Sequence, residues 1–468
     1  MTLRLQDTLT GRTRPLEPVE PGHVRIYTCG PTVYGPTHIG NFRSFLFADV
    51  LVRYLRYRGL RVTWVVNITD VDDKIIRGAA ESGVSIAELS KTWLDRFLAD
   101  GAALRMTPPD VLPRATEHIE PMVSLIETLL DSGHAYRTDD GSIFFRIASW
   151  PAYGRLARLD PEQLRSTERV EADEYGKTDV RDFALWKAPK PGEPSWATAI
   201  GAGRPGWHIE CSAMSMAYLG PSFDIHTGGV DLVFPHHEDE IAQSEAATGQ
   251  PFVRTWLHCA HLRLGGAKMA KSTGNISRVV DLLEAGVSPR ALRYALISVQ
   301  YRQGLEYSDA SLEAAAAAID RLDALLAGLE AYREVRHDAA DLDRRLAAAR
   351  AGFEAALDDD LNVSAALAAL FDLVRELNRR LADRALSTAD AARATAFLRE
   401  LDVVLGILPD PTEDLANAAR DLLAAREAAR AARDWSASDR LRDELLELGV
   451  AVEDTRDGQR WRRLEAVR

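Results

Sequence analysis

Hydrophobic residues near the start of the chain follow two different periods, which predict strands alternating with a helix. His23–Cys29 (HVRIYTC) is a short apolar, β-rich run followed by turn residues. From Asn41 to Arg58 apolar residues recur at helical spacing, and Arg61–Ile68 (RVTWVVNI) is again an apolar run of strand length. This order indicates a βαβ unit with parallel strands. Ligands bind such sheets at the carboxyl ends of their strands, where Cys29 lies.

The middle of the chain interrupts this alternation. Residues from about 120 to 205 combine a helical stretch (His118–Ser132), a short strand pattern (Ser142–Ile147) and a stretch rich in Pro and Gly (Lys187–Ser195). Such a mixture favours an insertion over a continuation of the sheet. The α/β pattern returns with Ser222–Pro235, and a helix is expected to begin near His236.

Helical patterns dominate the last third of the chain. From about Ser308, apolar residues recur at helical spacing in four successive stretches, which predicts a helical bundle. Beyond Pro409–Asp414, two further helical stretches lead to strand-like runs on either side of Asp457–Gly458, a pair typical of hairpin turns. We expect a small C-terminal α/β module there.

The fold class that these patterns predict is α/β, with a Rossmann-type parallel sheet, a connective insertion, a helical bundle and a small terminal module. One hydrophobic core rarely serves more than about 250–300 residues, so a chain of 468 residues needs several domains. We expect two halves of the Rossmann domain at 1–120 and 206–260, the insertion at 121–205, a linking region at 261–307, the bundle at 308–408 and the terminal module at 409–468.

Composition limits the class of protein. An apolar fraction of 46% and a charged fraction of 27% are typical of globular domains. The N-terminus has no apolar signal region and no apolar run approaches the roughly 20 residues that span a bilayer, so we expect a cytoplasmic protein without membrane contact. A net charge of -13 argues against non-specific binding of polyanions. The cysteines Cys29, Cys211 and Cys259 cannot form a closed disulfide framework.

Pro36–Asn41 (PTHIGN) is the first motif that suggests chemistry. Gly40 permits close backbone approach, the following helix presents unpaired N–H groups, and His38 and Asn41 are spaced to project together toward a phosphate. The alternative is that His38 only caps the helix.

Lys268–Ser272 (KMAKS) is the second such motif, with Gly265 and Gly266 before it. Lys268 and Lys271, on a loop flanked by glycines, can follow the negative charge that develops on an α-phosphate. The alternative is a solvated basic turn.

In this order the two motifs resemble the HIGH and KMSKS signatures of class I aminoacyl-tRNA synthetases. Asn41 stands in place of the final His of HIGH, and Ala270 in place of the first Ser of KMSKS. The resemblance to the cysteinyl-tRNA synthetase family extends over essentially the whole chain, including Arg433–Trp461 near its end. The similar segments are Cys29–Asn41, Asn67–Ile76, Gly206–Ser215, Phe223–Glu245 and Lys268–Asn275.

This resemblance implies a ligase that activates L-cysteine with ATP and Mg²⁺ to cysteinyl adenylate, then transfers it to the 3′-terminal adenosine of tRNA(Cys). A monomer is the family's expectation. The implied catalytic residues are His38, Asn41, Lys268 and Lys271. Contacts to ATP are implied for His38, Gly40, Asn41, Gly228, Gly229 and Lys271, and contacts to cysteine for Cys29, Thr69, Trp207 and Asp231. From sequence alone Trp207 could equally be a core residue.

The resemblance also implies one zinc ion per chain, with Cys29, Cys211, His236 and Glu240 as its ligands. Thiolate, imidazole and carboxylate are ligand types that zinc accepts. Spacing alone leaves His237 and Glu238 open as ligands, whereas Cys259 matches no ligand of the family. Zinc would favour a substrate thiolate over a hydroxyl, whereas an apolar pocket separates such near-isosteres only by roughly 10- to 200-fold.

By the same resemblance, the bundle and the terminal module contact tRNA and its anticodon, with Trp461, Arg462 and Arg463 as candidates. The alternative is that Trp461 anchors the hairpin. Two rival functions stay open: a cysteine ligase of the mycothiol-pathway type that uses an amino-sugar acceptor, and a non-catalytic, zinc-dependent RNA-binding paralogue. The long bundle argues against the first rival, and His38, Lys268 and Lys271 argue against the second.

Overall fold

The chain folds into two compact units. The first comprises Met1–Val279, Leu296–Tyr307 and Glu354–Ala365, and the second Val280–Ala295, Ser308–Phe353 and Ala366–Arg468. The structure is a computed structural model that describes residues 3–158, 181–264, 267–268, 277–335, 337–409, 417–455 and 458–463, some of them by backbone alone.

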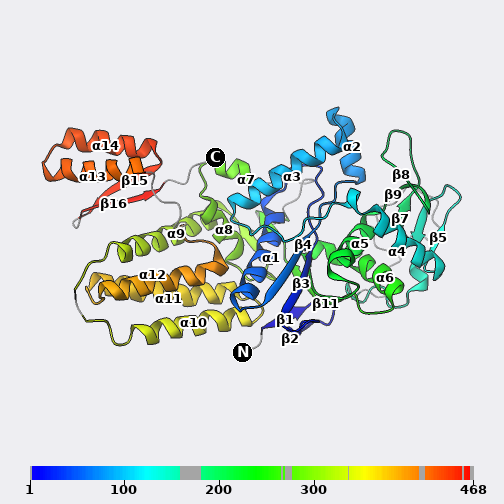
Figure 1. Cartoon of the computed structure of the whole chain (residues 1–468), viewed down its shortest axis with the longest axis horizontal. Helices are drawn as coiled ribbons and strands as arrows, with labels where there is room; N and C mark the ends of the chain where they lie inside the picture. Colours follow the sequence, from blue (N-terminus) through cyan, green and yellow to red (C-terminus); the bar gives the residue numbers. More distant parts are fainter. Residues whose placement is uncertain are drawn as a thin grey trace. The chain divides into compact units, whose positions relative to one another are not determined.

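A four-stranded parallel sheet forms the centre of the first unit (Figure 1). Thr227 lies in register with Thr28, and Thr28 with Val66, so the strands end at the same edge. The predicted βαβ unit is confirmed, with a helix between the first two strands. The order is β11 (Val253–Cys259), β10 (Phe223–Gly229), β3 (His23–Thr28) and β4 (Arg61–Val66), and the helix is α1 (Ile39–Tyr57).

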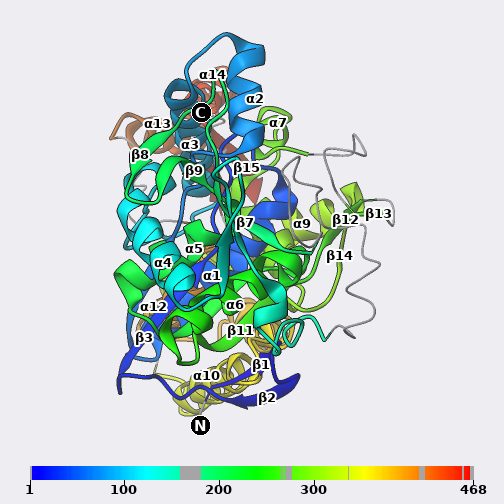
Figure 2. The ribbon, with the colours of Figure 1, turned by 90° about the vertical axis from the view of Figure 1, so that its right-hand side faces the viewer.

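Both faces of this sheet are buried. Tyr27 belongs to the core that the sheet shares with three helices, whereas the adjacent Ile26, also fully buried, faces the opposite side. Helix α1 contacts β4, β10 and β11, and α5 contacts β3. Helices α4 and α6 pack against α5 (Figure 2). Burial on both faces explains why the strands read as nearly continuous apolar runs. The three helices are α4 (Ile119–Asp131), α5 (Trp207–Leu219) and α6 (Glu238–Thr248).

The stretch expected to be an insertion forms a separate five-stranded antiparallel sheet. In sheet order its strands are β5 (Ala135–Arg137), β6 (Ile143–Phe145), β7 (Phe183–Lys187), β9 (Gly201–Pro205) and β8 (Trp196–Thr198). The other elements before it are the β1–β2 hairpin (Arg4–Asp7 and Arg12–Pro15), α2 (Asp73–Ser82) and α3 (Ile86–Ala103).

A small sheet follows β11 and carries the start of the KMAKS segment. Its central strand β12 pairs antiparallel with β13 and parallel with β14. The bounds are β12 (Leu262–Leu264), β13 (Ala267–Lys268) and β14 (Leu305–Tyr307), with α7 (Val279–Glu284) and α8 (Pro289–Ile297) between β13 and β14.

Four long helices form the predicted bundle, and apolar residues such as Leu322, Leu326 and Leu398 are buried in it. They are α9 (Asp309–Glu330), α10 (Leu342–Asp358), α11 (Val363–Ala382) and α12 (Thr388–Leu405). The terminal module has a small core that includes Leu423, Leu445 and Val450. It consists of α13 (Asn417–Ala431), α14 (Trp435–Glu447), β15 (Val450–Thr455) and β16 (Gly458–Arg463).

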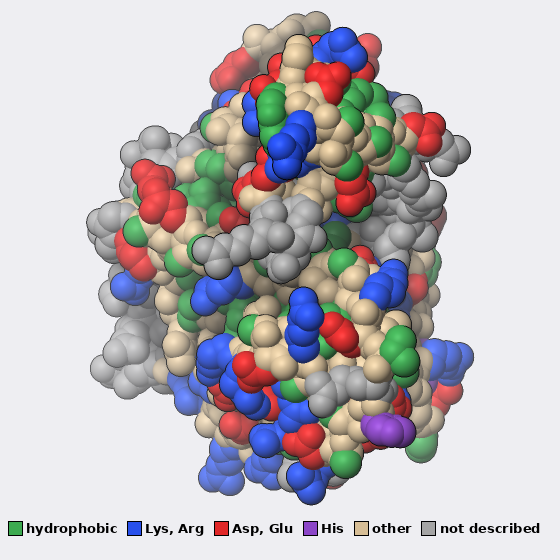
Figure 3. All heavy atoms as spheres, turned by 90° about the vertical axis from the view of Figure 1, so that its left-hand side faces the viewer, with side chains coloured by type: hydrophobic (Ala, Val, Ile, Leu, Met, Phe, Trp, Pro, Cys, Tyr) green, Lys and Arg blue, Asp and Glu red, His purple; other side chains and the backbone are tan. Residues whose placement is uncertain are grey.

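The face of the molecule drawn in Figure 3 carries side chains of both charges. Figure 3 shows Lys and Arg side chains interspersed with Asp and Glu over the face that it draws. Among the described helices, none is long and apolar enough to span a membrane.

Candidate active site and metal centre

The candidate site residues gather at the carboxyl edge of the parallel sheet. Cys29 directly follows β3, Thr69 lies shortly after β4, and Gly228 and Gly229 end β10. The Cys29 N–H donates to the carbonyl of Thr227 at 3.2 Å, which ties the end of β3 to β10. The sheet therefore places its candidate residues where parallel sheets bind ligands.

His38 caps the N-terminus of α1. Its Nδ1 accepts a hydrogen bond from the Asn41 backbone N–H at 3.2 Å, and the Asn41 side chain accepts one from the His38 N–H at 3.4 Å. A Cβ atom at Gly40 would lie only 2.9 Å from His38 Nδ1, so glycine leaves room for the ring. His38 thus does cap the helix, and the cap also fixes His38 and Asn41 beside the positive end of the helix.

The KMAKS segment lies only partly within the described residues. The backbone of Lys268 belongs to β13, whereas Lys271, Gly265 and Gly266 fall outside the described part of the chain. Where the chain is next described, the carbonyl of Ser277 accepts a hydrogen bond from the Ile39 N–H at 3.0 Å.

Four residues from three parts of the chain form a buried group that could hold a metal ion: Cys29, Cys211, His236 and Glu240. The two sulfurs lie 3.8 Å apart, and Cys29 Sγ lies 3.6 Å from Glu240 Oε1. His236 Nε2 lies 3.1 Å from the same oxygen. A tetrahedral zinc ion with bonds of about 2.3 Å to sulfur separates two thiolates by about 3.8 Å, so the donor set fits such an ion.

A second group shares two of these residues. Cys29, His226, His237 and Glu240 also bring donor atoms within 4.8 Å of one another. His237 Nε2 lies 3.3 Å from Cys29 Sγ, and His226 Nε2 lies 3.0 Å from Glu240 Oε2. His236 and His237 therefore serve different groups, and only the group of His236 contains both sulfurs.

Glu238, which spacing alone leaves open as a ligand, has another role. Its carboxylate accepts hydrogen bonds from the backbone N–H groups of Gly154, Leu156 and Ala157 at 2.8–3.0 Å. It belongs to neither metal-binding group of the described residues.

The electrostatics of the first group favour an anionic Cys211 and an anionic Glu240, whereas burial and the neighbouring Cys211 raise the pKa of Cys29. Burial raises the pKa of the Cys211 thiol, but Cys29 and His236 outweigh burial and bring this pKa down to about 6. Burial also raises the pKa of Glu240, which His226 and His236 lower to about 2. A thiolate and a carboxylate side by side in a buried place provide the negative charge that a divalent cation requires.

A series of hydrogen-bonded side chains leads from His236 Nδ1 through His208 and Asp239 to Tyr153. His236 Nδ1 lies 2.8 Å from His208 Nδ1, and His208 Nε2 lies 3.1 Å from Asp239 Oδ2. Tyr153 donates its hydroxyl to the other oxygen of Asp239. Such outer partners fix the ring orientation of a metal-binding histidine.

Of the residues implied for cysteine binding, Cys29 belongs to this group and Trp207 contacts it. The Thr69 hydroxyl donates to Glu210 Oε2 at 3.0 Å and accepts from the Asn67 side chain. The Trp207 ring stacks on His236, with centroids 4.1 Å apart, and is 38% exposed, so the core interpretation of Trp207 is wrong. Asp231 is exposed just beyond β10.

The paired glycines at the end of β10 leave space that side chains would fill. A Cβ atom at Gly228 would lie 2.7 Å from the His237 ring, and one at Gly229 would lie 2.5 Å from Asp231 Oδ1. Position 229 also faces α1, since the same Cβ would be 3.7 Å from Ser44 Oγ. These glycines therefore allow the His237 ring and the Asp231 carboxylate to approach the end of β10 closely.

Sequence reasoning missed several members of the site. His208 lies three residues before Cys211, a helical spacing that places both on one face of α5 and was a usable signal. Three further residues contact the site only in the folded chain, so sequence spacing gave no signal for them: His226, His258 and Asp239.

Family models match three successive regions. Residues 15–317 match the class I (C) tRNA synthetase catalytic domain, residues 352–409 the DALR domain, and residues 412–462 the cysteinyl-tRNA ligase anticodon binding domain.

Similar proteins cover nearly the whole chain. The cysteine–tRNA ligase of Solibacter usitatus is 46% identical over 99% of this chain and 100% of its own length. That of Halorhodospira halophila is 48% identical over 98% and 99%.

Solved structures are similar at the level of the fold. Mycobacterium tuberculosis methionyl-tRNA synthetase in complex with methionyl-adenylate has a TM-score of 0.59 at 19% identity, covering 82% of this chain and 88% of that one. The Agrobacterium radiobacter K84 agnB2 LeuRS-tRNA-LeuAMS complex has a TM-score of 0.60 at 13% identity, covering 84% and 85%.

Replacement of Cys211 tests the metal-binding group. We expect Cys211→Ser to lose bound metal, because a hydroxyl is a far weaker ligand than the thiolate that this group favours. Elemental analysis of purified protein measures this loss. Cys259→Ser is the matched control: burial raises the pKa of Cys259 to about 11, and the residue belongs to neither metal-binding group. Equal metal content in both variants would contradict the assignment.

Asp239→Asn tests the support behind His236. Loss of the carboxylate beside His208 should weaken metal binding by roughly 10- to 100-fold, as for other outer partners of metal ligands. Competition with a chromophoric chelator measures the affinity. Glu238→Gln, which alters the adjacent carboxylate, should leave the affinity within a few-fold of the wild type. An unchanged affinity in Asp239→Asn would show that the chain of groups does not support the metal.

Proposed function

The chain belongs to the cysteine–tRNA ligase family of class I tRNA synthetases, and on that premise we propose how its residues perform the reaction. It is an aminoacyl-tRNA ligase that joins cysteine to tRNA(Cys) at the expense of ATP. The observation that carries the proposal is the buried group of Cys29, Cys211, His236 and Glu240 at the sheet edge, in a chain that matches ligases over its full length.

Zinc is the metal that suits this group. Cys29, Cys211, His236 and Glu240 would hold it, with His208 and Asp239 fixing the ring of His236. When bound, zinc supplies a centre that prefers the thiolate of cysteine to the hydroxyl of serine. Trp207 would close the pocket beside His236, and Thr69, oriented by Glu210, would line it. The carboxylate of Asp231 is suited to the ammonium group of the substrate.

The cysteine carboxylate would attack the α-phosphorus of ATP, forming cysteinyl adenylate and releasing pyrophosphate. This step needs positioning and charge stabilisation rather than extensive proton transfer. His38 and Asn41 would meet the phosphates at the N-terminus of α1, with Gly40 between them, while Lys268 and Lys271 follow the developing charge. Gly228 and Gly229 would admit the adenosine, and Mg²⁺ would accompany ATP.

Transfer to tRNA would follow on the same site, with attack of a hydroxyl of the 3′-terminal adenosine on the adenylate carbonyl. The bundle and terminal module would bind the tRNA, and Trp461, which is 45% exposed on β16, would stack on a base. This exposure argues against Trp461 as a buried anchor of the hairpin. The side chains of Arg462 and Arg463 lie outside the described part of the structure.

We propose a monomer that acts in the cytoplasm.

An anticodon-binding match at residues 412–462 supports tRNA, rather than an amino sugar, as the acceptor. A catalytic-domain match at residues 15–317 supports catalysis over a purely RNA-binding role.

Cysteine-dependent exchange of pyrophosphate into ATP tests the proposed activation step. We expect exchange with cysteine, its loss after removal of zinc by a chelator, and discrimination against serine well beyond the roughly 100-fold that an apolar pocket achieves.

His38→Ala should lower kcat by about 100-fold, because a group at the developing charge is lost, while zinc content stays unchanged. Charging of tRNA(Cys) then tests the second step. Exchange without cysteine dependence, or adenylate that only an amino sugar consumes, would refute the proposal.

A further inference from the structure

Arg43 is a buried cation on α1, two residues beyond Asn41, and is only 1% exposed. Within the described part of the chain, its guanidinium donates to backbone carbonyls. Nη1 donates to the carbonyls of Ala260 and His261 at 2.9 Å, and Nη2 donates to that of Gln303, with that of Gln300 at 3.5 Å. Within the described residues, no carboxylate lies within ion-pair distance of Arg43. The hydrogen bonds of Arg43 therefore fix these backbone segments and do not neutralise its positive charge.

The carbonyls that Arg43 binds belong to the two segments that enter the small sheet. Ala260 and His261 connect β11 to β12, and residues 300–303 lead into β14. The two segments also bond each other, since the Ala260 N–H donates to the Tyr301 carbonyl at 2.7 Å. Strand β12 in turn pairs with β13, where Arg263 lies opposite Lys268. One side chain of α1 thus fixes the base of the sheet from which the KMAKS segment begins.

The same helix also holds the chain where that segment ends. The Ile39 N–H donates to the carbonyl of Ser277, and the backbone of His38 pairs with that of Arg278 in an isolated antiparallel β-bridge. The described chain on both sides of the lysine-bearing segment is therefore attached to the first turns of α1: Ser277 at Ile39, and Ala260 and His261 at Arg43. Asn41 lies between these two attachment points, and His38 directly precedes the first of them.

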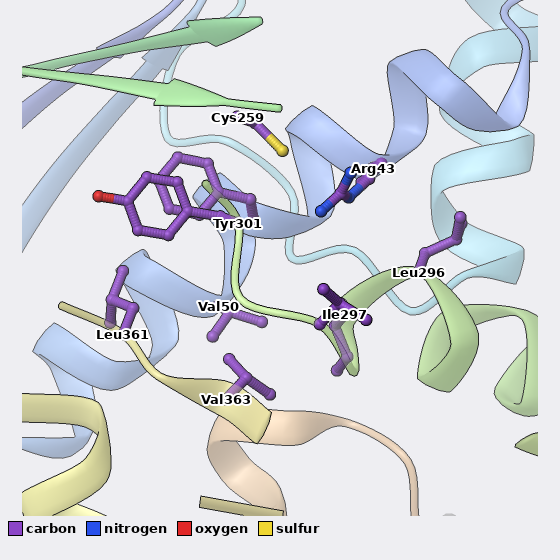
Figure 4. A pocket seen from close by; sticks show the side chains of 10 residues that line it. Arg43, Val50, Cys259, Leu296, Ile297, Tyr301, Leu361 and Val363 are labelled. Atoms are coloured by element: carbon purple, nitrogen blue, oxygen red, sulfur yellow. The ribbon is translucent and has the colours of Figure 1, made fainter. Parts of the chain in front are cut away.

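Arg43 also borders a small, mostly apolar pocket within the first unit (Figure 4). In Figure 4 it lies across the pocket from Tyr301 and Leu361, and Val50 of α1 lies between them. Val50 lines the same pocket and is buried, but as an aliphatic side chain it makes no hydrogen bond. Arg43 and Val50 both belong to α1 and line this pocket, but only Arg43 bonds the segments that enter the small sheet. Substitutions at these two positions therefore separate an effect on positioning from an effect on packing.

We propose that Arg43 is a positioning residue for adenylate formation, which fixes the strands that lead into the lysine-bearing segment relative to the His38–Asn41 end of α1. The inference rests on the proposed function, because it assigns Lys268 and Lys271 to the α-phosphate. Arg43 touches neither substrate nor reacting atoms; it acts through the carbonyls at the base of β12 and β14. A shift of about 1 Å in such a framework can cost about 100-fold in rate.

Arg43→Lys and Arg43→Met test the proposal through pyrophosphate exchange, with rates normalised by active-site titration. We expect Arg43→Met to lower kcat by roughly 10- to 100-fold, because lost alignment affects the transition state more than binding. The KM for cysteine and the zinc content should stay within a few-fold of the wild type. Arg43→Lys should recover only part of kcat, since one ammonium group cannot span both segments as a guanidinium does.

Val50→Ala is the matched control, because it enlarges the same pocket without removing a hydrogen bond to either segment. It should lower the melting temperature while kcat per active site stays near that of the wild type. If Arg43→Met does not fold, the comparison of Arg43→Lys with Val50→Ala decides. A normal kcat per active site in the folded Arg43 variants, or an equal loss of kcat in Val50→Ala, would overturn the proposal. Wild-type protein without cysteine-dependent exchange would instead refute the proposed function itself.

Discussion

The strands of the central sheet all run in one direction, and this parallel pairing determines where the chemistry lies. Parallel strands require a crossover between them, so residues far apart in the chain end at one edge. Cys29 and Cys211 are 182 positions apart, yet their sulfurs lie 3.8 Å from each other. The same edge receives Thr69 after β4 and the paired glycines of β10. The other parts of the site, including the histidine cluster and the cap of α1, take their positions from this convergence.

Three consecutive acidic residues at the start of α6 have three different roles in and around the metal-binding group. Glu240 offers a ligand oxygen, Asp239 holds His208 behind His236, and Glu238 binds the backbone between Gly154 and Ala157. Successive positions on a helix point in directions about 100° apart, so neighbouring carboxylates reach different partners. A buried carboxylate requires compensation, and each of these three finds it in a different group. The resulting cluster is rigid because its polar atoms support one another.

Much of the fold was predictable from sequence because periodicity is a local property. The strands at His23 and Arg61, the helix between them and the four bundle helices appear where apolar spacing indicates them. The start of α6 was less well predicted: Phe234 has a non-helical backbone, and the regular helix begins only at Glu238. His226 and His258 could not be assigned, because each meets His237 only after β10 and β11 have paired. The choice between His236 and His237 likewise depends on side-chain directions that spacing does not encode.

The first unit is not one continuous stretch of chain, since it also includes Leu296–Tyr307 and Glu354–Ala365. Asp360, within the last of these segments, accepts hydrogen bonds from the Gln6 N–H, the Tyr301 hydroxyl and Arg302 Nε. These bonds join the start of the chain to residues that the ribosome makes more than 350 positions later. The unit that holds the metal-binding group therefore cannot be completed on the ribosome until helices α9 and α10 have been synthesised. Its last native contacts form late in translation, and a fragment that stops at Tyr307 lacks them.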